Sequence, residues 1–385
     1  MRFPSKLPTT ALSQDSSVRG FQRGAFTLVE MLVATVILTL IMVMVLSITD
    51  QTSRIWKRSS SEIQAFQNAR AAYDTMTMRL SQATLNTYLD YYNSSNQSRT
   101  AYLAANPSGT FVPVNYARSS ELHFIVDQAT TLVPLDTGAS PAQTASCHPG
   151  HAVFFQAPLG FTTSSGTYGG LANMLNACGY YVEFNTDLPY LPSFLSSATA
   201  IHQRYRYRLM EFLQPTESNT IFSTTSGNNW FTSFLPPNTT QAQAPLRMLA
   251  ENIVALAIVP ELSPQTNASQ TNLLNGSYTY DTRAGDIVTN KLIHNQLPPL
   301  LRVVMVAIDE PSAIRLNPNG SNTPPSLISG LSFFKTTTAT TTTGSPNADI
   351  NNDLSALTQA LSAQKINYRV FDTDIAIRGA KWSAQ

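Results

Sequence analysis

The sequence predicts an α+β protein in which one long N-terminal helix packs on an antiparallel β-sheet head with long loop insertions. The helix is predicted by residues 26–90, which contain neither Pro nor Gly and carry first a continuous apolar segment, then an apolar stripe at helical spacing. The head, residues 91–385, is predicted by short aromatic and β-branched segments that polar loops separate. Because these segments show no internal repeat, we expect one head domain with insertions rather than two domains.

Composition narrows the classes of function. The formal net charge is +1 and only 12% of the residues are charged, whereas a general nucleic-acid binder carries a strongly basic face. No nucleic-acid partner is therefore expected. The sequence contains no G-x-S-x-G, P-loop, H-E-x-x-H or paired C-x-x-C motif. We predict that the protein is not an enzyme and has no catalytic residue, no metal ligand and no cofactor.

The first part of the predicted helix is a candidate membrane span. Residues 25–48 carry one charged side chain, that of Glu30, and as a helix they cover ~36 Å, enough to cross a hydrocarbon core of ~30 Å. The segment is longer than the apolar region of a secretory signal, which is usually ~7–15 residues. We expect a single-pass transmembrane helix over residues 26–49, surrounded by membrane lipid.

Glu30 is costly inside such a span, because a carboxylate at the centre of a membrane helix opposes insertion by ~2.5–3.5 kcal/mol. Two explanations stay open. Either the glutamate lies close enough to the interface to reach the headgroups, or a cation at the same depth neutralises it. A free α-amino group at Phe26, on a neighbouring copy of the helix, would supply such a cation.

The segment GAFTLVEMLVA resembles the processing motif of type IV prepilins and pseudopilins, in which a small residue precedes Phe-Thr-Leu-x-Glu and an apolar helix. The resemblance implies a leader over residues 1–25. It implies that a prepilin peptidase and methyltransferase cleaves before Phe26 and N-methylates the new amine. It also implies that Glu30 helps the subunit dock to other pilins or pseudopilins through the N-terminal helix. The other motif residues are Gly24, Ala25, Thr27, Leu28 and Val29.

Two cleavage positions stay open. The residue before the cut is usually Gly in this family, and Gly24 stands one place before Ala25. A cut after Gly24 would leave Ala25 first and Glu30 sixth in the mature chain. We favour the Ala25–Phe26 bond, because it makes Glu30 the fifth residue, keeps the Phe-to-Glu spacing of the family, and Ala is also small.

Charge alone does not orient the span, because the cations on its two sides are nearly balanced. The resemblance places the N-terminus in the bacterial cytoplasm, the helix in the inner membrane and the head in the periplasm, or the whole subunit in an extracellular filament.

Residues 50–90 are predicted to continue the helix with an amphipathic surface out to about Tyr88. An apolar stripe at helical spacing predicts the face that packs against the head. Its repeating positions are Phe66, Tyr73 and Leu80, with Ala69, Met76 and Ala83 between or after them.

Seven segments of the head are predicted to be strands from their aromatic and β-branched content. They are Glu121–Asp127, His151–Ala157, Gly179–Asn185, Arg204–Phe212, Asn252–Leu262, Pro298–Glu310 and Ile366–Gly379. Among them, Arg204–Phe212 alternates Arg with Tyr, which favours a solvated edge strand with a basic face. A short helix is predicted over Asp353–Gln364 with Asp353 as its N-cap. Surface loops are predicted at Tyr91–Thr100, Thr224–Trp230 and Phe334–Asn347.

Parts of the head resemble one branch of the same family. YRYRLMEF, LRMLAENIVALAIVP and LPPLLRVVMVAIDE are similar to segments of the J-type minor pseudopilins of type II secretion systems. SQATLNTY and IRGAKWS resemble the predicted pilins called Verru_Chthon cassette protein C. These resemblances imply a pilin-like fold and a non-catalytic minor subunit of a type II secretion pseudopilus or a type IV pilus-like filament. The alternatives are a signal-anchored periplasmic enzyme or glycan-binding protein, and a DNA-uptake or adhesion pilus subunit.

The segment CHPGH is a candidate for a metal site or for part of a disulfide. It brings together Cys147, His148 and His151, and Cys178 follows later in the chain. Two Cys and two His are a zinc-binding set, but adjacent Cys and His rarely reach one ion. We favour a disulfide between Cys147 and Cys178, which would stabilise a periplasmic loop by ~3–4 kcal/mol.

Overall fold

The computed structural model describes most of the chain and divides it into two compact units, Met1–Lys57 and Arg58–Gln385. The described residues are 26–138, 142–171, 173–192, 203–222, 229–239, 244–261, 278–284, 293–329, 334 and 346–381. The predicted leader, with Gly24 and Ala25, lies outside them, as do residues 335–345 of the threonine-rich loop and most of the loop at Thr224–Trp230.

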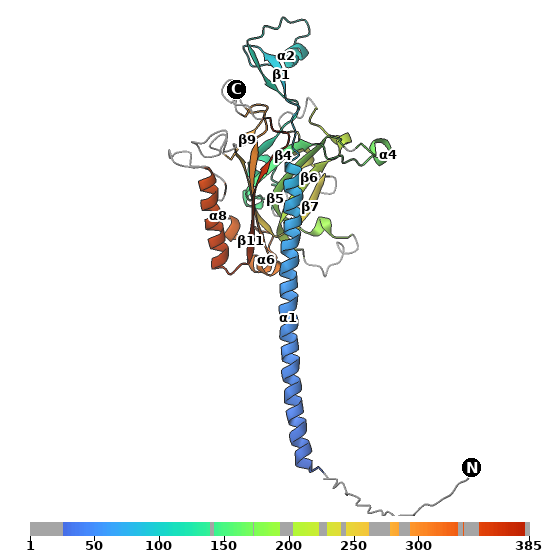
Figure 1. Ribbon diagram of the computed structural model, residues 1–385, viewed down its shortest axis with the longest axis vertical. Coiled ribbons are helices and arrows are strands. Elements are labelled where there is room, and N and C mark those ends of the chain that lie inside the picture. The colour runs from blue at the N-terminus through green and yellow to red at the C-terminus, as the bar shows by residue number, and fades with distance from the viewer. Residues whose placement is uncertain are drawn as a thin grey trace, which may run out of the picture. The chain divides into compact units, whose positions relative to one another are not determined.

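A single helix, α1 (Leu28–Leu80), runs through the apolar segment and the amphipathic one (Figure 1). The prediction that it extends to about Tyr88 is wrong. The amides of Ser81, Gln82 and Ala83 still bond back to the last turn of the helix, and from there the backbone bonds to the head. The amide of Arg378 donates to the carbonyl of Ser81 at 2.9 Å, and the amide of Thr84 donates to the carbonyl of Gln156 at 2.9 Å. These tertiary hydrogen bonds replace the next helical turn.

The largest sheet of the head has six antiparallel strands in the order β7-β6-β5-β4-β3-β9. They are β3 (Ile125–Gln128), β4 (His151–Ala157), β5 (Asn176–Thr186), β6 (Tyr205–Gln214), β7 (Leu246–Glu251) and β9 (Tyr280–Asp281). Three of the strands predicted in this part of the sequence, β4, β5 and β6, are confirmed, whereas the predicted strand Glu121–Asp127 is formed only from Ile125 onward. The prediction that Arg204–Phe212 is an edge strand is wrong, because β6 is hydrogen-bonded to β5 on one side and to β7 on the other.

A second sheet has three antiparallel strands in the order β11-β10-β8. They are β8 (Ile253–Glu261), β10 (Leu300–Ile308) and β11 (Tyr368–Ala376), as the sequence predicted. Most residues of β10 are inaccessible to solvent. Consecutive apolar residues suit this central position, because both faces of the strand are covered.

A two-stranded ribbon of β1 (Tyr88–Tyr92) and β2 (Asn115–Ser119) carries the short helix α2 (Arg99–Ala105) between its strands. The segment Tyr91–Thr100, predicted as a loop, therefore holds the end of β1 and the start of α2. The other described helices are α3 (Ala129–Leu132), α4 (Ser165–Tyr168), α6 (Glu310–Leu316), α7 (Ser326–Ser329) and α8 (Pro346–Ala363). Single 3₁₀ turns are η1 (Ala145–Cys147), η2 (Leu188–Tyr190), η3 (Thr216–Ser218) and η5 (Thr232–Phe234).

The predicted helix over Asp353–Gln364 is present, but the prediction that Asp353 caps it is wrong. The helix, α8, already begins at Pro346, so Asp353 lies inside it. Its carboxylate instead accepts a hydrogen bond of 2.8 Å from the amide of Phe334, which ties the helix to the preceding chain.

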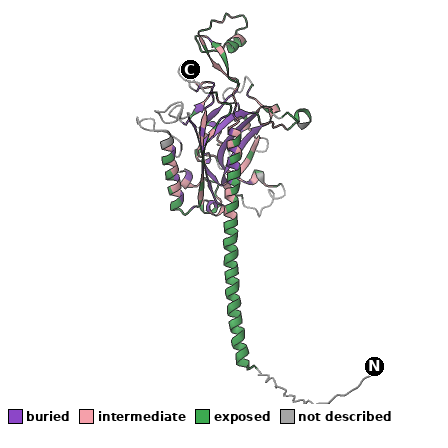
Figure 2. Cartoon of the chain, viewed as in Figure 1, coloured by how far each residue is buried: buried purple, intermediate pink, exposed green. Residues whose placement is uncertain are grey.

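The apolar stripe of α1 lies in the main hydrophobic core of the head, as predicted. Ala69, Tyr73, Met76 and Leu80 are buried there with residues of β4, β5, β6, β8, β10 and β11. Figure 2 shows the contrast along α1, which is exposed throughout its first unit and buried on one face further on. A smaller aromatic core lies on the other side of the six-stranded sheet and includes the stacked rings of Phe154 and Phe231, 3.8 Å apart.

Candidate functional site

The candidate site is the start of α1, where the structure describes Phe26 through Glu30. Thr27 and Glu30 bond to each other reciprocally. The carboxylate oxygen Oε2 of Glu30 accepts from the backbone amide of Thr27 at 2.9 Å and from its hydroxyl at 2.9 Å. The Thr27 hydroxyl in turn accepts from the Glu30 amide at 3.2 Å. This is a capping box, which satisfies amide groups that have no partner inside the helix.

The capping box also has a signal in the sequence. Thr-Leu-Val-Glu matches the Thr-x-x-Glu pattern that starts many helices. It provides a third reason for a glutamate at this position, besides headgroup contact and a partner cation. The side chain can therefore have a local role in starting the helix and still have an intermolecular one.

The helix after Glu30 is apolar on every side. Its side chains from Leu28 to Ile48 are all exposed, and most of them are Leu, Val, Ile or Met. A helix that is apolar all round is stable only inside a protein core or a membrane. Within the described residues, α1 alone is long and apolar enough to cross a membrane.

The few polar side chains of this segment are satisfied within the helix. The hydroxyls of Thr35, Thr39 and Thr49 donate to the carbonyls of Leu32, Val36 and Val45 at 2.8–2.9 Å. Such bonds remove the cost of placing a hydroxyl in a medium without water. Glu30 is then the only side chain between Phe26 and Thr49 that carries a charge into this environment.

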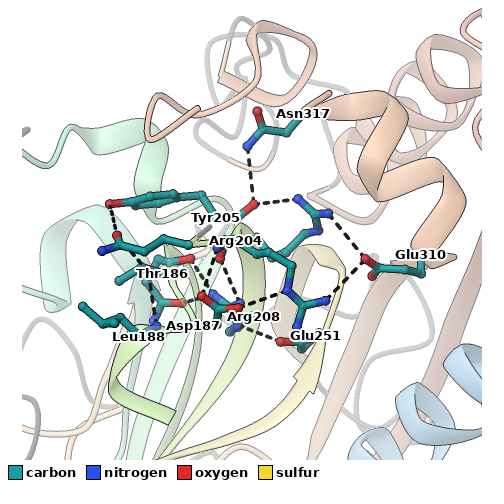
Figure 3. A network of polar contacts seen from close by, with 12 residues as sticks. Thr186, Asp187, Leu188, Arg204, Tyr205, Arg208, Glu251, Glu310 and Asn317 are labelled. Carbon is teal, nitrogen blue, oxygen red and sulfur yellow. Dashed lines mark hydrogen bonds and ion pairs between the residues drawn. The ribbon is translucent and has the colours of Figure 1, made fainter. Parts of the chain in front are cut away.

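The head contains a network of charged residues around β6 (Figure 3). Arg208, whose side chain has 0% exposure, donates to Glu251 at 3.2 Å and to the Asn185 side chain at 2.7 Å. Arg204 forms an ion pair with Asp187 at 3.0 Å. Arg206 reaches Glu310 at 3.4 Å. The arginine stripe is therefore not a solvated basic face, because three carboxylates from other elements compensate it.

A second charged cluster joins α1 to the sheet. Glu211 of β6 forms ion pairs with Arg79 of α1 and, at 3.1 Å, with Arg247 of β7. The hydroxyl of Tyr180 donates to the same carboxylate at 2.8 Å. Each charge in this cluster faces an opposite one, which indicates a structural role in orienting the helix.

His123 forms the most enzyme-like arrangement in the head. Its Nε2 lies 2.6 Å from the carboxylate of Asp281, and the indole N–H of Trp230 donates to its Nδ1 at 3.2 Å. Nδ1 is thus an acceptor, so the proton is on Nε2 and is shared with Asp281. Burial by itself would raise the pKa of the Asp281 carboxyl. The hydrogen bonds from His123 and from two backbone amides outweigh this effect, so the pKa is lowered. Both ring nitrogens are engaged by neighbouring side chains, which is the arrangement of a structural histidine.

The predicted disulfide is contradicted, because Cys147 and Cys178 are both free thiols in the buried core. Cys147 lies in η1 next to Ser146, whose carbonyl accepts from the hydroxyl of Tyr207 at 3.4 Å, and Tyr207 pairs with Phe184 of β5. Cys178 lies six residues earlier on that strand, opposite Leu213. Six residues of a strand span ~20 Å, whereas a disulfide requires Cα atoms within ~7 Å. The topology therefore holds the thiols apart.

The alternative zinc site does not form either. His151 Nδ1 lies 2.9 Å from the carbonyl of Ile258, and its Nε2 lies 3.0 Å from the carbonyl of Phe334. His148 is buried against the ring of Tyr181, and this burial lowers its pKa to about 4. Within the described residues, no group of three or more His, Cys, Asp or Glu side chains is placed to hold a metal ion.

The β1–β2 ribbon has an unusual distribution of apolar residues. One side is anchored, since Tyr92 is buried near His294 and the side chain of Asn295 donates to the carbonyl of Arg118 at 3.0 Å. On the exposed side, Tyr91 and Tyr116 form a cross-strand pair with ring centroids 5.0 Å apart. A half-exposed antiparallel ribbon normally carries polar residues on its outer face.

Comparison with known proteins adds no family to these observations. No family model matches the chain, and neither a curated protein nor a solved structure does. The functional conclusion therefore depends on the residues and geometry described above.

Proposed function

We propose that the chain is a non-catalytic, pilin-like minor subunit that is anchored in the bacterial inner membrane and assembles into a pseudopilus or pilus-like filament. The observation that carries the proposal is the start of α1. There a Phe-Thr-Leu-Val-Glu segment stands directly before a helix that is apolar and exposed on all sides. A soluble protein has no use for such a surface, and a charged side chain within a membrane span is a candidate for a role beyond that of its helix cap.

The geometry of Glu30 suits docking to a neighbouring subunit. Both bonds from Thr27 go to one carboxylate oxygen, Oε2. The other oxygen, Oε1, can then accept from the amine of Phe26 on an adjacent helix without breaking the capping box. In a membrane, an ion pair of this kind offsets the cost of inserting the carboxylate. The amine exists only if the leader is removed, so processing and docking are linked.

The head supports the same proposal through its architecture. Helix α1 continues from the apolar segment into the core of an antiparallel α+β head without a break. Charge pairs and a hydrogen bond from Tyr73 to the carbonyl of Val303, at 2.7 Å, hold it there.

Intact mass spectrometry of the protein from native membranes tests the proposal directly. We expect a chain that starts at N-methylated Phe26. A chain that starts at Ala25 would retain the family and shift the register of Glu30. An unprocessed Met1, or cleavage near Ser47, would overturn the proposal in favour of a signal-anchored or exported protein.

The partners are tested separately, by co-purification from membranes. We expect other pilin-like subunits and the prepilin peptidase to be recovered with the wild-type chain. Recovery of DNA or a glycan without pilin-like subunits would instead favour an uptake, adhesion or glycan-binding role.

A further inference from the structure

We infer that residues 54–57 of α1 form a second membrane contact, which binds the headgroups of anionic phospholipids where the helix leaves the hydrocarbon core. This inference rests on the membrane span of the proposed function. It does not depend on filament assembly or on processing of the leader. Figure 1 shows the segment as part of the uninterrupted helix α1.

The first observation is an exposed apolar pair within an otherwise polar stretch. Ile55 and Trp56 are 69% and 76% exposed, although residues 50–54 and 57–62 around them are all polar or charged. An exposed Trp of this kind is typical of the membrane–water interface, where its ring contacts acyl chains and its N–H contacts headgroups. The pair is not explained by packing, because both residues belong to the first compact unit, where the described side chains are all exposed.

The second observation is the depth of the pair. A core of ~30 Å that begins at Leu28, the first residue of α1, ends near Thr49 if the helix has an ordinary tilt of ~20°. The backbone of Trp56 then lies ~10 Å further along the membrane normal. Because side chains on a helix point toward its N-terminus, the ring of Trp56 reaches back into the headgroup layer, which is ~5–7.5 Å deep on each side. The continuity of α1 from Leu28 to Leu80 makes this depth a property of one helix.

The third observation is charge. Arg54 and Lys57 flank the apolar pair, and Arg58 follows in the sequence. Arg54 forms an exposed ion pair with Asp50 at 2.8 Å, and exposed pairs contribute little by themselves. After this pairing, Lys57 and Arg58 leave a net positive charge at the depth of the phosphates. A positive segment beside a membrane selects anionic over zwitterionic lipid, so phosphatidylglycerol fits this surface better than phosphatidylcholine.

The experiment uses the purified full chain in vesicles of phosphatidylcholine and phosphatidylglycerol, with Trp fluorescence as the readout. Quenching lipids carry bromine either near the headgroup end or near the terminus of the acyl chain. We expect the shallow label to quench more strongly, and the difference to disappear in Trp56→Tyr. The other two tryptophans, Trp382 and the fully buried Trp230, are present in both proteins, so the difference between the two proteins reports Trp56 alone.

Lipid selectivity is then measured with headgroup-labelled quenchers on the two lipids. We expect phosphatidylglycerol to be preferred, and the preference to fall about fivefold for each cation removed in Lys57→Gln and in Lys57→Gln with Arg58→Gln. Arg70→Gln is the matched control. It removes one exposed cation two turns or more beyond the segment on the same helix, and it should leave the preference unchanged.

Two results would overturn the inference, and they are distinguishable. Equal quenching by the two labelled lipids, or no shallow quenching of Trp56 in a chain that floats with the vesicles, overturns the lipid contact alone. A chain that does not float with the vesicles lacks the span, and both this inference and the proposed function then fail.

Discussion

Arg79 in the last turn of α1 forms an ion pair with Glu211 in the middle of β6, across 132 positions of sequence. The carboxylate of Glu211 is 1% exposed and also serves Tyr180 and Arg247. A buried carboxylate of this kind is tolerated only while a partly desolvated cation, here that of Arg79, stays beside it. The pair therefore joins the last turn of α1 to the sheet, and substitutions in it test how much this buried charge contributes to stability.

We expect Glu211→Ala to destabilise the protein by about 3–5 kcal/mol, because it leaves the Arg79 guanidinium largely desolvated without a partner. Arg247→Ala is the matched control: its side chain is 50% exposed, and loss of its pair should cost at most about 1 kcal/mol. Urea unfolding of the detergent-solubilised chain measures both values. Equal losses of unfolding free energy in the two variants would show that the burial of the Arg79–Glu211 pair does not determine its contribution to stability.

Arg208 gives a second prediction about buried charge. Its side chain donates to Glu251, to Asn185 and, at 3.2 Å, to the carbonyl of Arg204. We expect Arg208→Met to cost about 3–5 kcal/mol. Arg208→Lys should recover only part of this loss, because an ammonium group cannot reach the same set of acceptors as a planar guanidinium.

The control for Arg208 is Arg204→Ala. That side chain is 52% exposed, so its removal should cost at most about 1 kcal/mol. Differential scanning calorimetry of the three variants would decide. A large loss of stability in Arg204→Ala with none in Arg208→Met would contradict the assignment of Arg208 as the stabilising buried charge.

These networks show where sequence patterns were informative and where they were not. The strands were predictable, because each consists of β-branched or aromatic residues that suit a covered sheet. The position of β6 inside the sheet was not predictable. Its alternating arginines look like a charged edge, and the compensating Glu251 and Glu310 come from elements far away in the sequence. Polar partners of this kind become visible only once the topology is known.

The same difference between local sequence signals and long-range contacts explains where the elements end and how the candidate site is formed. The register of Thr27 and Glu30 is local, so the capping box could be predicted from four residues. The end of α1 at Leu80 depends on the amide of Arg378, nearly three hundred positions later. The separation of the two cysteines depends on how η1 sits along β5. Neither of these could be derived from local sequence.

The free thiols provide a direct chemical test. Burial raises the pKa of Cys178 to about 12, and burial also raises the pKa of Cys147. We expect neither thiol to react with a maleimide in the native protein at neutral pH, because the thiolate is the reactive form. Both should react after unfolding without a reducing agent. Mass spectrometry of the labelled chain counts the adducts, and an unfolded chain that takes up none would restore the disulfide.

The raised pKa of Tyr73 leads us to expect that the protein loses stability at alkaline pH. Its burial raises its pKa to about 12, from an unfolded value of about 10. A raised folded pKa means that the folded state favours the neutral phenol. Its contribution is therefore complete below pH ~10 and is lost as the pH rises towards ~12. We expect the free energy of unfolding to fall across this window, and to fall less steeply in Tyr73→Phe.

At neutral pH, Tyr73→Phe should cost about 0.5–1.5 kcal/mol, because it removes the hydrogen bond to the carbonyl of Val303. Tyr116→Phe, on the exposed ribbon, is the control and should change neither the neutral value nor the alkaline slope. Chemical unfolding followed by circular dichroism at a series of pH values gives both quantities. An unchanged slope in Tyr73→Phe would assign the alkaline loss to other groups.

The last prediction separates the two roles of Glu30. Glu30→Gln keeps the capping box, because Gln also fits its last position, but it removes the charge that a neighbouring amine would need. Glu30→Ala removes both. If docking depends on the ion pair, both variants should insert into membranes and both should fail to co-assemble with other subunits.

Thr27→Val completes the design, because it removes the hydroxyl of the capping box and leaves the carboxylate. Loss of a cap costs about 0.5–2 kcal/mol of helix stability, so this variant should fray the start of α1 and still assemble. Cysteine cross-linking between neighbouring helices, together with recovery of filaments from the cell surface or periplasm, measures assembly. Normal assembly of Glu30→Gln with failure of Thr27→Val would show that Glu30 acts as a helix cap alone, and the docking role would be rejected.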